Sequence, residues 1–169
     1  MDLALALRHY PDAERCLGEV PRFEDAPAWI YSLDNPYLHG VYAPVTGEMS
    51  VEALLVEGEI PADLVGAYFR NGPNPVYQPK NRYHPFDGDG MVHAFHLHDG
   101  KANYNNRWVR TNKWKIEDRE GRNVINAMNP FDCEPEYSDF VLKDKDGLAN
   151  TATVYHGGRL LVMEEGHPP

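Results

Sequence analysis

Glycine and proline occur so often in this chain that they divide most of it into short segments. There are 14 of each among 169 residues, so about one residue in six is a glycine or a proline. Turn-forming pairs such as Asp99-Gly100 and Gly157-Gly158 interrupt the chain from Pro27 onward. The runs between them are rich in β-branched and aromatic residues. This pattern predicts short antiparallel strands joined by tight turns, and therefore an all-β fold.

The strands can be assigned to particular runs. Residues 66–70 and 91–97 are expected to be strands, and 102–111 to be the return strand of a hairpin across Asp99-Gly100. Residues 151–156 and 159–164 are expected to pair across Gly157-Gly158. Residues 113–117 are a candidate for a further strand, and 129–145 for an insertion or loop. Only residues 1–25 approach helical spacing, which predicts a short N-terminal helical or irregular segment.

Charge and composition limit the classes of partner and compartment. Sixteen basic against 26 acidic residues give a net charge of −10, and an acidic surface disfavours non-specific nucleic-acid binding. No run approaches the ~18 apolar residues of a membrane span, and residues 1–8 lack the features of a signal peptide. Two cysteines, Cys16 and Cys133, do not make a disulfide framework. We expect a cytoplasmic protein with reduced thiols.

Two sequence patterns are candidates for a metal-binding site. His93, His96 and His98 lie on one predicted strand, where alternation places His96 and His98 on the same face. An H-x-H pair can ligate a metal, but solvated or hydrogen-bonded histidines give the same pattern, so a small metalloprotein remains an alternative. The sequence Asp87-Gly88-Asp89-Gly90 does not follow the register of a calcium-binding loop, and it predicts a tight turn instead.

Four segments together carry a family resemblance. Residues 58–75, 86–93, 106–111 and 149–152 occur in an order that strongly resembles the N-terminal part of the carotenoid cleavage oxygenase family. The resemblance runs from about Asn35 to Pro169. It implies a partial seven-bladed β-propeller, of which this chain supplies the first blades. Residues 1–34 would be an N-terminal extension, and 35–169 the front of a propeller truncated at its C-terminal end.

The resemblance also implies a chemistry. Members of this family hold Fe(II) with four histidines, three of which are hydrogen-bonded by glutamates, and they insert dioxygen across a polyene or stilbene double bond to give two carbonyl products. The first ligand histidine of relatives follows an A-H-P type motif that is absent here, so the resemblance assigns no metal ligand within this chain. The isolated chain is therefore expected to bind no iron tightly and to be inactive. Glu165 matches a family glutamate that orients a ligand histidine; the alternative is a solvated acid beside Glu164.

The resemblance further bears on the substrate. Lignostilbene-cleaving members hold a phenol with a lysine and a tyrosine, but Glu164 stands at the lysine position, and the tyrosine falls near Ala127 or Met128. We therefore expect the parent enzyme to act on an apolar carotenoid or apocarotenoid together with dioxygen, with peripheral membrane contact. A fragment of a lignostilbene-type stilbene dioxygenase and a non-catalytic β-rich binding module are the alternatives.

Overall fold

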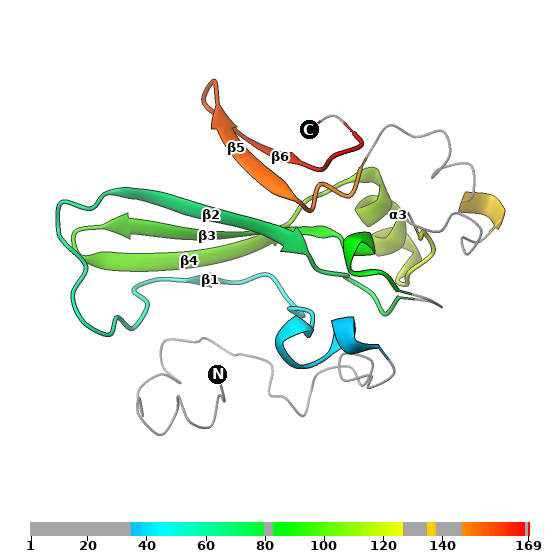
Figure 1. Cartoon of the computed structure of the whole chain (residues 1–169), viewed down its shortest axis with the longest axis horizontal. Coiled ribbons are helices and arrows are strands. Elements are labelled where there is room, and N and C mark those ends of the chain that lie inside the picture. The colour runs from blue at the N-terminus through cyan, green and yellow to red at the C-terminus, as the bar shows by residue number, and fades with distance from the viewer. Residues whose placement is uncertain (1–34, 80–82, 127–134, 138–146, 168) are drawn as a thin grey trace. The chain divides into compact units, whose positions relative to one another are not determined.

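The computed structural model describes residues 35–79, 83–126, 135–137, 147–167 and 169 (Figure 1). The contacts within it separate two units. The first contains residues 48–69 and 93–106, and the second contains the other described residues. The predicted N-terminal helical segment, and with it the proposed extension 1–34, lies outside the described residues. Each unit is considered by itself below.

Four strands form the larger sheet. They are β1 (Ser50–Val51), β2 (Gly66–Pro73), β3 (Gly90–His98) and β4 (Lys101–Trp108), in the order β1-β4-β3-β2 (Figure 1). Strand β1 runs antiparallel to β4. The predicted hairpin across Asp99-Gly100 is confirmed, because both turn residues have positive φ angles, of 50° and 69°, as a two-residue hairpin loop requires. The return strand ends three residues earlier than predicted.

The first unit combines a small aliphatic core with an aromatic row. Val51, Ala94 and Ala102 are buried. The ring of Phe95 lies 5.1 Å from that of Tyr104 and 6.3 Å from that of Tyr68, measured between centroids. Aromatic pairs at such separations add to the stability that burial provides.

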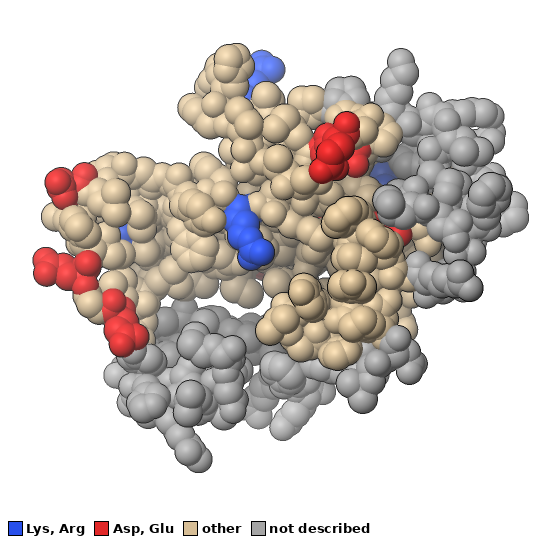
Figure 2. Space-filling view, in the orientation of Figure 1, with Lys and Arg blue, Asp and Glu red and all other residues tan. Residues whose placement is uncertain are grey.

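Acidic side chains gather in the loops of this first unit. The exposed acids are Glu52, Glu57, Glu59, Asp63 and Asp99. Figure 2 shows acidic side chains at the end of the sheet where the β1–β2 and β3–β4 loops lie. Such a surface repels a phosphate backbone, in keeping with the charge argument made from the sequence.

The second unit contains a separate two-stranded sheet. Strands β5 (Ala152–His156) and β6 (Arg159–Met163) pair antiparallel, with His156 opposite Arg159 and Ala152 opposite Met163. Gly157 and Gly158 form the turn between them with φ angles of 56° and 77°, which only glycine adopts without strain. The predicted pairing of these two runs is confirmed.

The candidate strand at 113–117 was wrong, because these residues belong to helix α3 (Asn112–Glu120). The Thr111 hydroxyl accepts a hydrogen bond from the Trp114 amide at 3.1 Å and caps the N-terminus. Gly121 ends the helix in the left-handed region, at φ 66°. Charged residues stand at every second position from 113 to 117, a spacing that is compatible with a half-exposed strand. The decisive spacing is instead the four residues between Lys113 and Glu117, which puts both on one face of a helix.

Short 3₁₀ helices complete the secondary structure of the described residues. They are η3 (Pro36–Leu38), η4 (Gly40–Tyr42), η5 (Pro85–Asp87) and η7 (Pro135–Tyr137). Apart from η7, the predicted insertion 129–145 lies outside the described residues. Strands therefore dominate, as the all-β prediction required, but the described residues form no closed barrel or propeller. Within the described part of the chain, no helix is long and apolar enough to cross a membrane.

Candidate functional site

A buried ionic cluster is the most strongly organised polar feature of the second unit. The ammonium of Lys113 donates to Asp89 Oδ1 at 2.8 Å and to Glu117 Oε2 at 2.9 Å. The side chains of Lys113, Asp89 and Glu117 are only 3%, 1% and 1% exposed. Charged groups are almost never buried this completely unless they are paired. We call these three residues the Lys113 cluster.

The local structure explains how Asp89 reaches this position. Asp89 immediately precedes β3, and its Oδ2 accepts a hydrogen bond from the Val76 amide at 3.2 Å. The next residue, Gly90, packs directly against the backbone of Ala149, so that a Cβ at this position would overlap the Ala149 carbonyl. The chain can therefore turn into β3 here only because residue 90 has no side chain, and this turn places Asp89 in the interior.

Glu117 ties the helix to the segment that follows it. While Oε2 pairs with Lys113, Oε1 accepts hydrogen bonds from Asn123 Nδ2, Val124 N and Ile125 N at 2.8, 3.0 and 2.9 Å. One carboxylate thus satisfies the buried backbone amides of Val124 and Ile125, which lie outside any helix or strand. The Lys113 cluster consequently joins three parts of the second unit: the start of β3, helix α3 and residues 123–126.

The protonation states follow from burial and pairing. Burial alone lowers the pKa of Lys113, but the charges of Asp89 and Glu117 outweigh it, and the net pKa is raised. Burial raises the pKa of Glu117, and the Lys113 charge opposes that rise. Lys113 is therefore held as an ammonium ion. Because a lysine nucleophile must be neutral, the cluster can orient and stabilise neighbouring groups but cannot act as an amine nucleophile.

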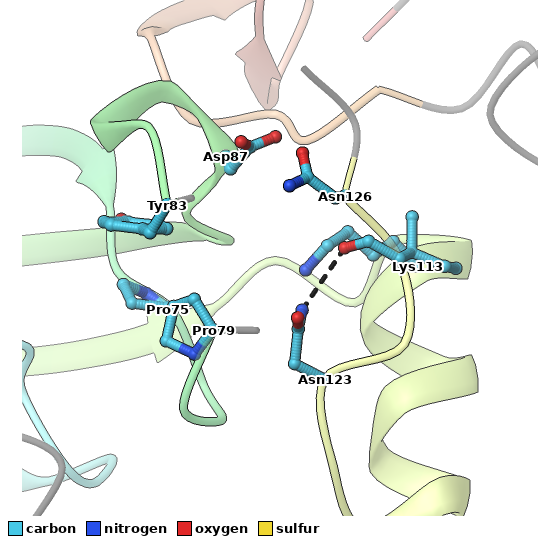
Figure 3. Close-up of a pocket in the computed structure, with 8 residues that line it drawn as sticks. Pro75, Pro79, Tyr83, Asp87, Lys113, Asn123 and Asn126 are labelled. Carbon is cyan, nitrogen blue, oxygen red and sulfur yellow. Dashed lines mark hydrogen bonds between the residues drawn. The ribbon is translucent and has the colours of Figure 1, made fainter. Parts of the chain in front are cut away.

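A small cavity lined by polar and apolar side chains, Pro75, Pro79 and Ile125 among the apolar ones, adjoins the Lys113 cluster. Its volume is about 10 Å³, and its lining includes Tyr83, Asp87, Lys113, Asn123 and Asn126 (Figure 3). Burial, followed by the nearby charges of Asp87 and Asp89, raises the pKa of Tyr83 and keeps its phenol protonated. A space of this size is about the smallest that holds one water molecule.

Glu165, the candidate from the sequence, lies just beyond the end of β6. Its side chain is exposed, and its Oε2 accepts a hydrogen bond from the Thr151 hydroxyl at 3.4 Å. The neighbouring Glu164 is 16% exposed, packs against Gly147 and contacts His167 Nδ1. Among the described residues, the imidazole of His167 is therefore in contact with Glu164 and not with Glu165. The role of Glu165 stays a prediction.

The three histidines of the alternative metal site do not converge. His93 Nδ1 lies 2.7 Å from the Tyr104 hydroxyl, the His96 ring packs edge-on against Phe69, and His98 pairs with Asp99 at the exposed turn. Within the described ranges, no three His, Cys, Asp or Glu side chains are grouped so as to hold a metal ion. The hypothesis of a small histidine metal site has no support in this geometry. The iron implied by the resemblance likewise finds no ligand set there.

The sequence interpretation missed the Lys113 cluster. Asp89 was assigned to a turn, and Lys113 and Glu117 to a strand. A signal was nevertheless present: Thr111 and Gly121 are typical helix caps, and they enclose a lysine and a glutamate four residues apart. The region near Ala127 and Met128, where the resemblance places a substrate-binding tyrosine in stilbene-cleaving relatives, lies outside the described residues.

Comparisons with known proteins agree over most of the chain. The family model described as "Retinal pigment epithelial membrane protein" matches residues 42–169. A carotenoid 9,10(9',10')-cleavage dioxygenase 1 of Phaseolus vulgaris is 37% identical over 82% of this chain and 28% of its own length. A carotenoid cleavage oxygenase of Mycobacterium tuberculosis is 42% identical over 78% of this chain and 24% of its own.

A solved structure shows the same relationship. The lignostilbene dioxygenase of Pseudomonas brassicacearum is 30% identical and superposes with a TM-score of 0.65 over 78% of this chain and 27% of that one. The chain thus spans about a quarter of the length of each of these relatives.

Proposed function

Because the chain belongs to the carotenoid cleavage oxygenase family, we propose that it is the N-terminal part of an Fe(II) dioxygenase that cleaves a double bond of a carotenoid or apocarotenoid. The products are two carbonyl compounds. The observation that carries the proposal is the family match over residues 42–169, together with relatives named as carotenoid-cleaving enzymes. We assign the iron to the whole protein, because the resemblance places its four ligand histidines outside this chain.

Within this proposal, Glu165 is a residue of this chain that takes part in the reaction. We assign it the task of accepting a hydrogen bond from an iron-ligating histidine, which fixes the orientation of that ring and increases its basicity. Glu165 is suited to this because it is exposed, its contact with Thr151 is long, and its Oε1 has no hydrogen-bond partner among the described residues. It is a positioning residue and does not itself touch the reacting atoms.

The experiment uses the whole iron-loaded protein. It compares wild type, Glu165→Gln and a control, Glu57→Gln, whose side chain is exposed in the first unit. Oxygen-dependent loss of apocarotenoid absorbance and bound iron are both measured. We expect E165Q to lower activity or iron affinity about 10- to 100-fold, and E57Q to match wild type. Wild-type activity and iron content in E165Q would overturn the role of Glu165. Failure of the wild-type protein to cleave any polyene would overturn the function itself.

A stilbene-cleaving enzyme is the second candidate, favoured by the structural match to a lignostilbene dioxygenase. Against it stands Glu164, which occupies the position that the resemblance assigns to a phenol-binding lysine. Its carboxylate already contacts His167, and a carboxylate would repel a phenolate. Assaying a phenolic stilbene beside the apocarotenoid separates the two: faster turnover of the stilbene would replace the carotenoid proposal.

The location of the whole protein follows from its proposed substrate. An apolar polyene concentrates in membranes, so we extend the proposal to a cytoplasmic protein with peripheral membrane contact. Co-sedimentation with vesicles of neutral phospholipid tests this extension. Recovery of all of the protein in the supernatant would refute it without affecting the assigned chemistry.

A non-catalytic binding module is the remaining alternative. It would require the native gene product to end at Pro169 and to fold cooperatively. Sequencing the native transcript beyond the Pro169 codon decides between them. An open frame with an A-H-P motif and three further histidines supports the dioxygenase, whereas a stop codon supports the module.

A further inference from the structure

The hydrogen bonds of Lys113 leave one donor to account for. A lysine ammonium carries three N–H groups and accepts no hydrogen bond. Two of them are used by Asp89 and Glu117, and no third partner occurs among the described residues. Because the Lys113 side chain is 3% exposed, bulk solvent cannot satisfy the remaining donor. A buried charged donor without an acceptor would cost free energy.

The position of the small cavity supplies the answer. Lys113 forms part of its lining, and Asp87, Asn123, Asn126 and Tyr83 provide further polar groups around it (Figure 3). We propose that this cavity binds one ordered water molecule, which accepts the third N–H of Lys113 and donates to the carboxylate of Asp87 and the amide oxygen of Asn126. The volume of about 10 Å³ is sufficient for a single water molecule.

The chemistry of the lining selects water over an ion. The occupant must accept a hydrogen bond from an ammonium group, which a metal cation cannot do. An anion could accept, but Asp87, Asp89 and Glu117 place three carboxylates on or beside the cavity, against the one positive charge of Lys113. Water both accepts and donates, and buried waters typically make about three hydrogen bonds.

The proposed water has a structural consequence. It would link helix α3, through Lys113, to η5, through Asp87, and to the segment that ends at Asn126. These two connections are additional to the direct bonds of the Lys113 cluster. The water is thus part of the junction that positions residues 123–126, and its contribution resembles that of a direct hydrogen bond.

The first test is a crystal structure of the whole protein at a resolution that reveals ordered solvent. We expect a water peak about 2.7–3.2 Å from Lys113 Nζ, within reach of Asp87 and Asn126. An empty cavity, or a protein side chain bonded to Nζ in its place, would overturn the proposal. This outcome does not depend on iron, substrate or activity, so it is separate from the fate of the proposed function.

The second test counts long-lived waters in solution by magnetic relaxation dispersion of the water signal. Asn126→Leu replaces a polar lining group by a larger apolar one and should remove one long-lived water from the count. The control is Lys115→Met, since Lys115 lies on the same helix but is exposed, and this variant should leave the count unchanged. An unchanged count in a folded N126L would refute the site. If N126L does not fold, the wild-type crystal structure still decides.

Discussion

Replacing Lys113 by methionine is the sharpest perturbation of this fold. The methionine keeps most of the length of the side chain and its apolar stem, but it removes the only cation of the Lys113 cluster. Asp89 and Glu117, each 1% exposed, are then left facing each other without a counter-charge. The change therefore isolates the electrostatic part of the interaction from the packing part.

The magnitude follows from the two bonds that are lost. Hydrogen bonds to charged groups contribute about 1.5–3 kcal/mol each, and those of Lys113 measure 2.8 and 2.9 Å. Protonation of a carboxylate recovers part of the loss, and the raised pKa of Glu117 makes it the group to be protonated. We expect a net cost of about 3–5 kcal/mol, the usual result of breaking a buried ion pair from one side.

Hydrogen exchange of residues 112–126 in the whole protein measures this cost locally. At 1.4 kcal/mol for each factor of ten, exchange should accelerate about 100- to 4,000-fold. Lys115→Met, on the exposed face of the same helix, should change it little. Glu117→Gln should cost less than K113M, because glutamine still presents an oxygen to the amides of Val124 and Ile125. The double variant K113M/E117Q should cost less than the sum of the two. Exchange in K113M equal to that in K115M would refute the reasoning.

Three further predictions rest on other features. Lys113 and Tyr83 both have raised pKa values in the folded protein. Each group therefore stabilises the fold at pH values below its unfolded pKa, and this stability is lost as the pH rises above about 10. Urea titrations at increasing pH should show that the free energy of unfolding falls less steeply in Tyr83→Phe than in wild type. An equally steep fall with pH in the two proteins would contradict the prediction. Gly90→Ala should destabilise by about 3 kcal/mol or more through overlap with the backbone, whereas Gly72→Ala, which meets nothing within 4 Å, should be tolerated; thermal unfolding of both variants tests this, and equal midpoints would refute it. In the isolated 169-residue chain, amides of β5 and β6 should exchange faster than those of α3, because a two-stranded sheet is marginal by itself; protection equal to that of α3 would argue for a self-sufficient module.

The parts of this fold that sequence analysis predicted are those in which local chemistry is sufficient. Asp99-Gly100 and Gly157-Gly158 both supply the positive φ angles that their hairpins need, so the turn residues alone fixed which runs pair. Helix α3 was not predicted, and its charges at positions 113, 115 and 117 are as compatible with a half-exposed strand as with a helix. Its caps carried the correct information, and they are weaker signals than periodicity in so short an element.

The Lys113 cluster was beyond prediction for a different reason. Asp89 and Lys113 are 24 residues apart, and no local pattern links an acid before one strand to a lysine in a later helix. The contact between Glu164 and His167 could not be predicted either, although the two residues are close in sequence. It depends on the path that the chain takes after β6. The family resemblance identified Glu165 by position alone. Its partner is a histidine that the resemblance places outside this chain.

The sequence Asp87-Gly88-Asp89-Gly90 shows how packing can produce a pattern that resembles an ion-binding motif. Gly88 leaves no room for a side chain, since a Cβ would lie 2.8 Å from neighbouring backbone, and Gly90 is more restricted still, at 2.0 Å. Asp89 neutralises the ammonium of Lys113, and Asp87 lines the adjoining cavity. Each acid thus faces the interior and each glycine permits a close approach of two chains. The alternation of acids and glycines therefore reflects a buried turn around a lysine, whose ammonium takes the place that a metal cation would have in a calcium loop.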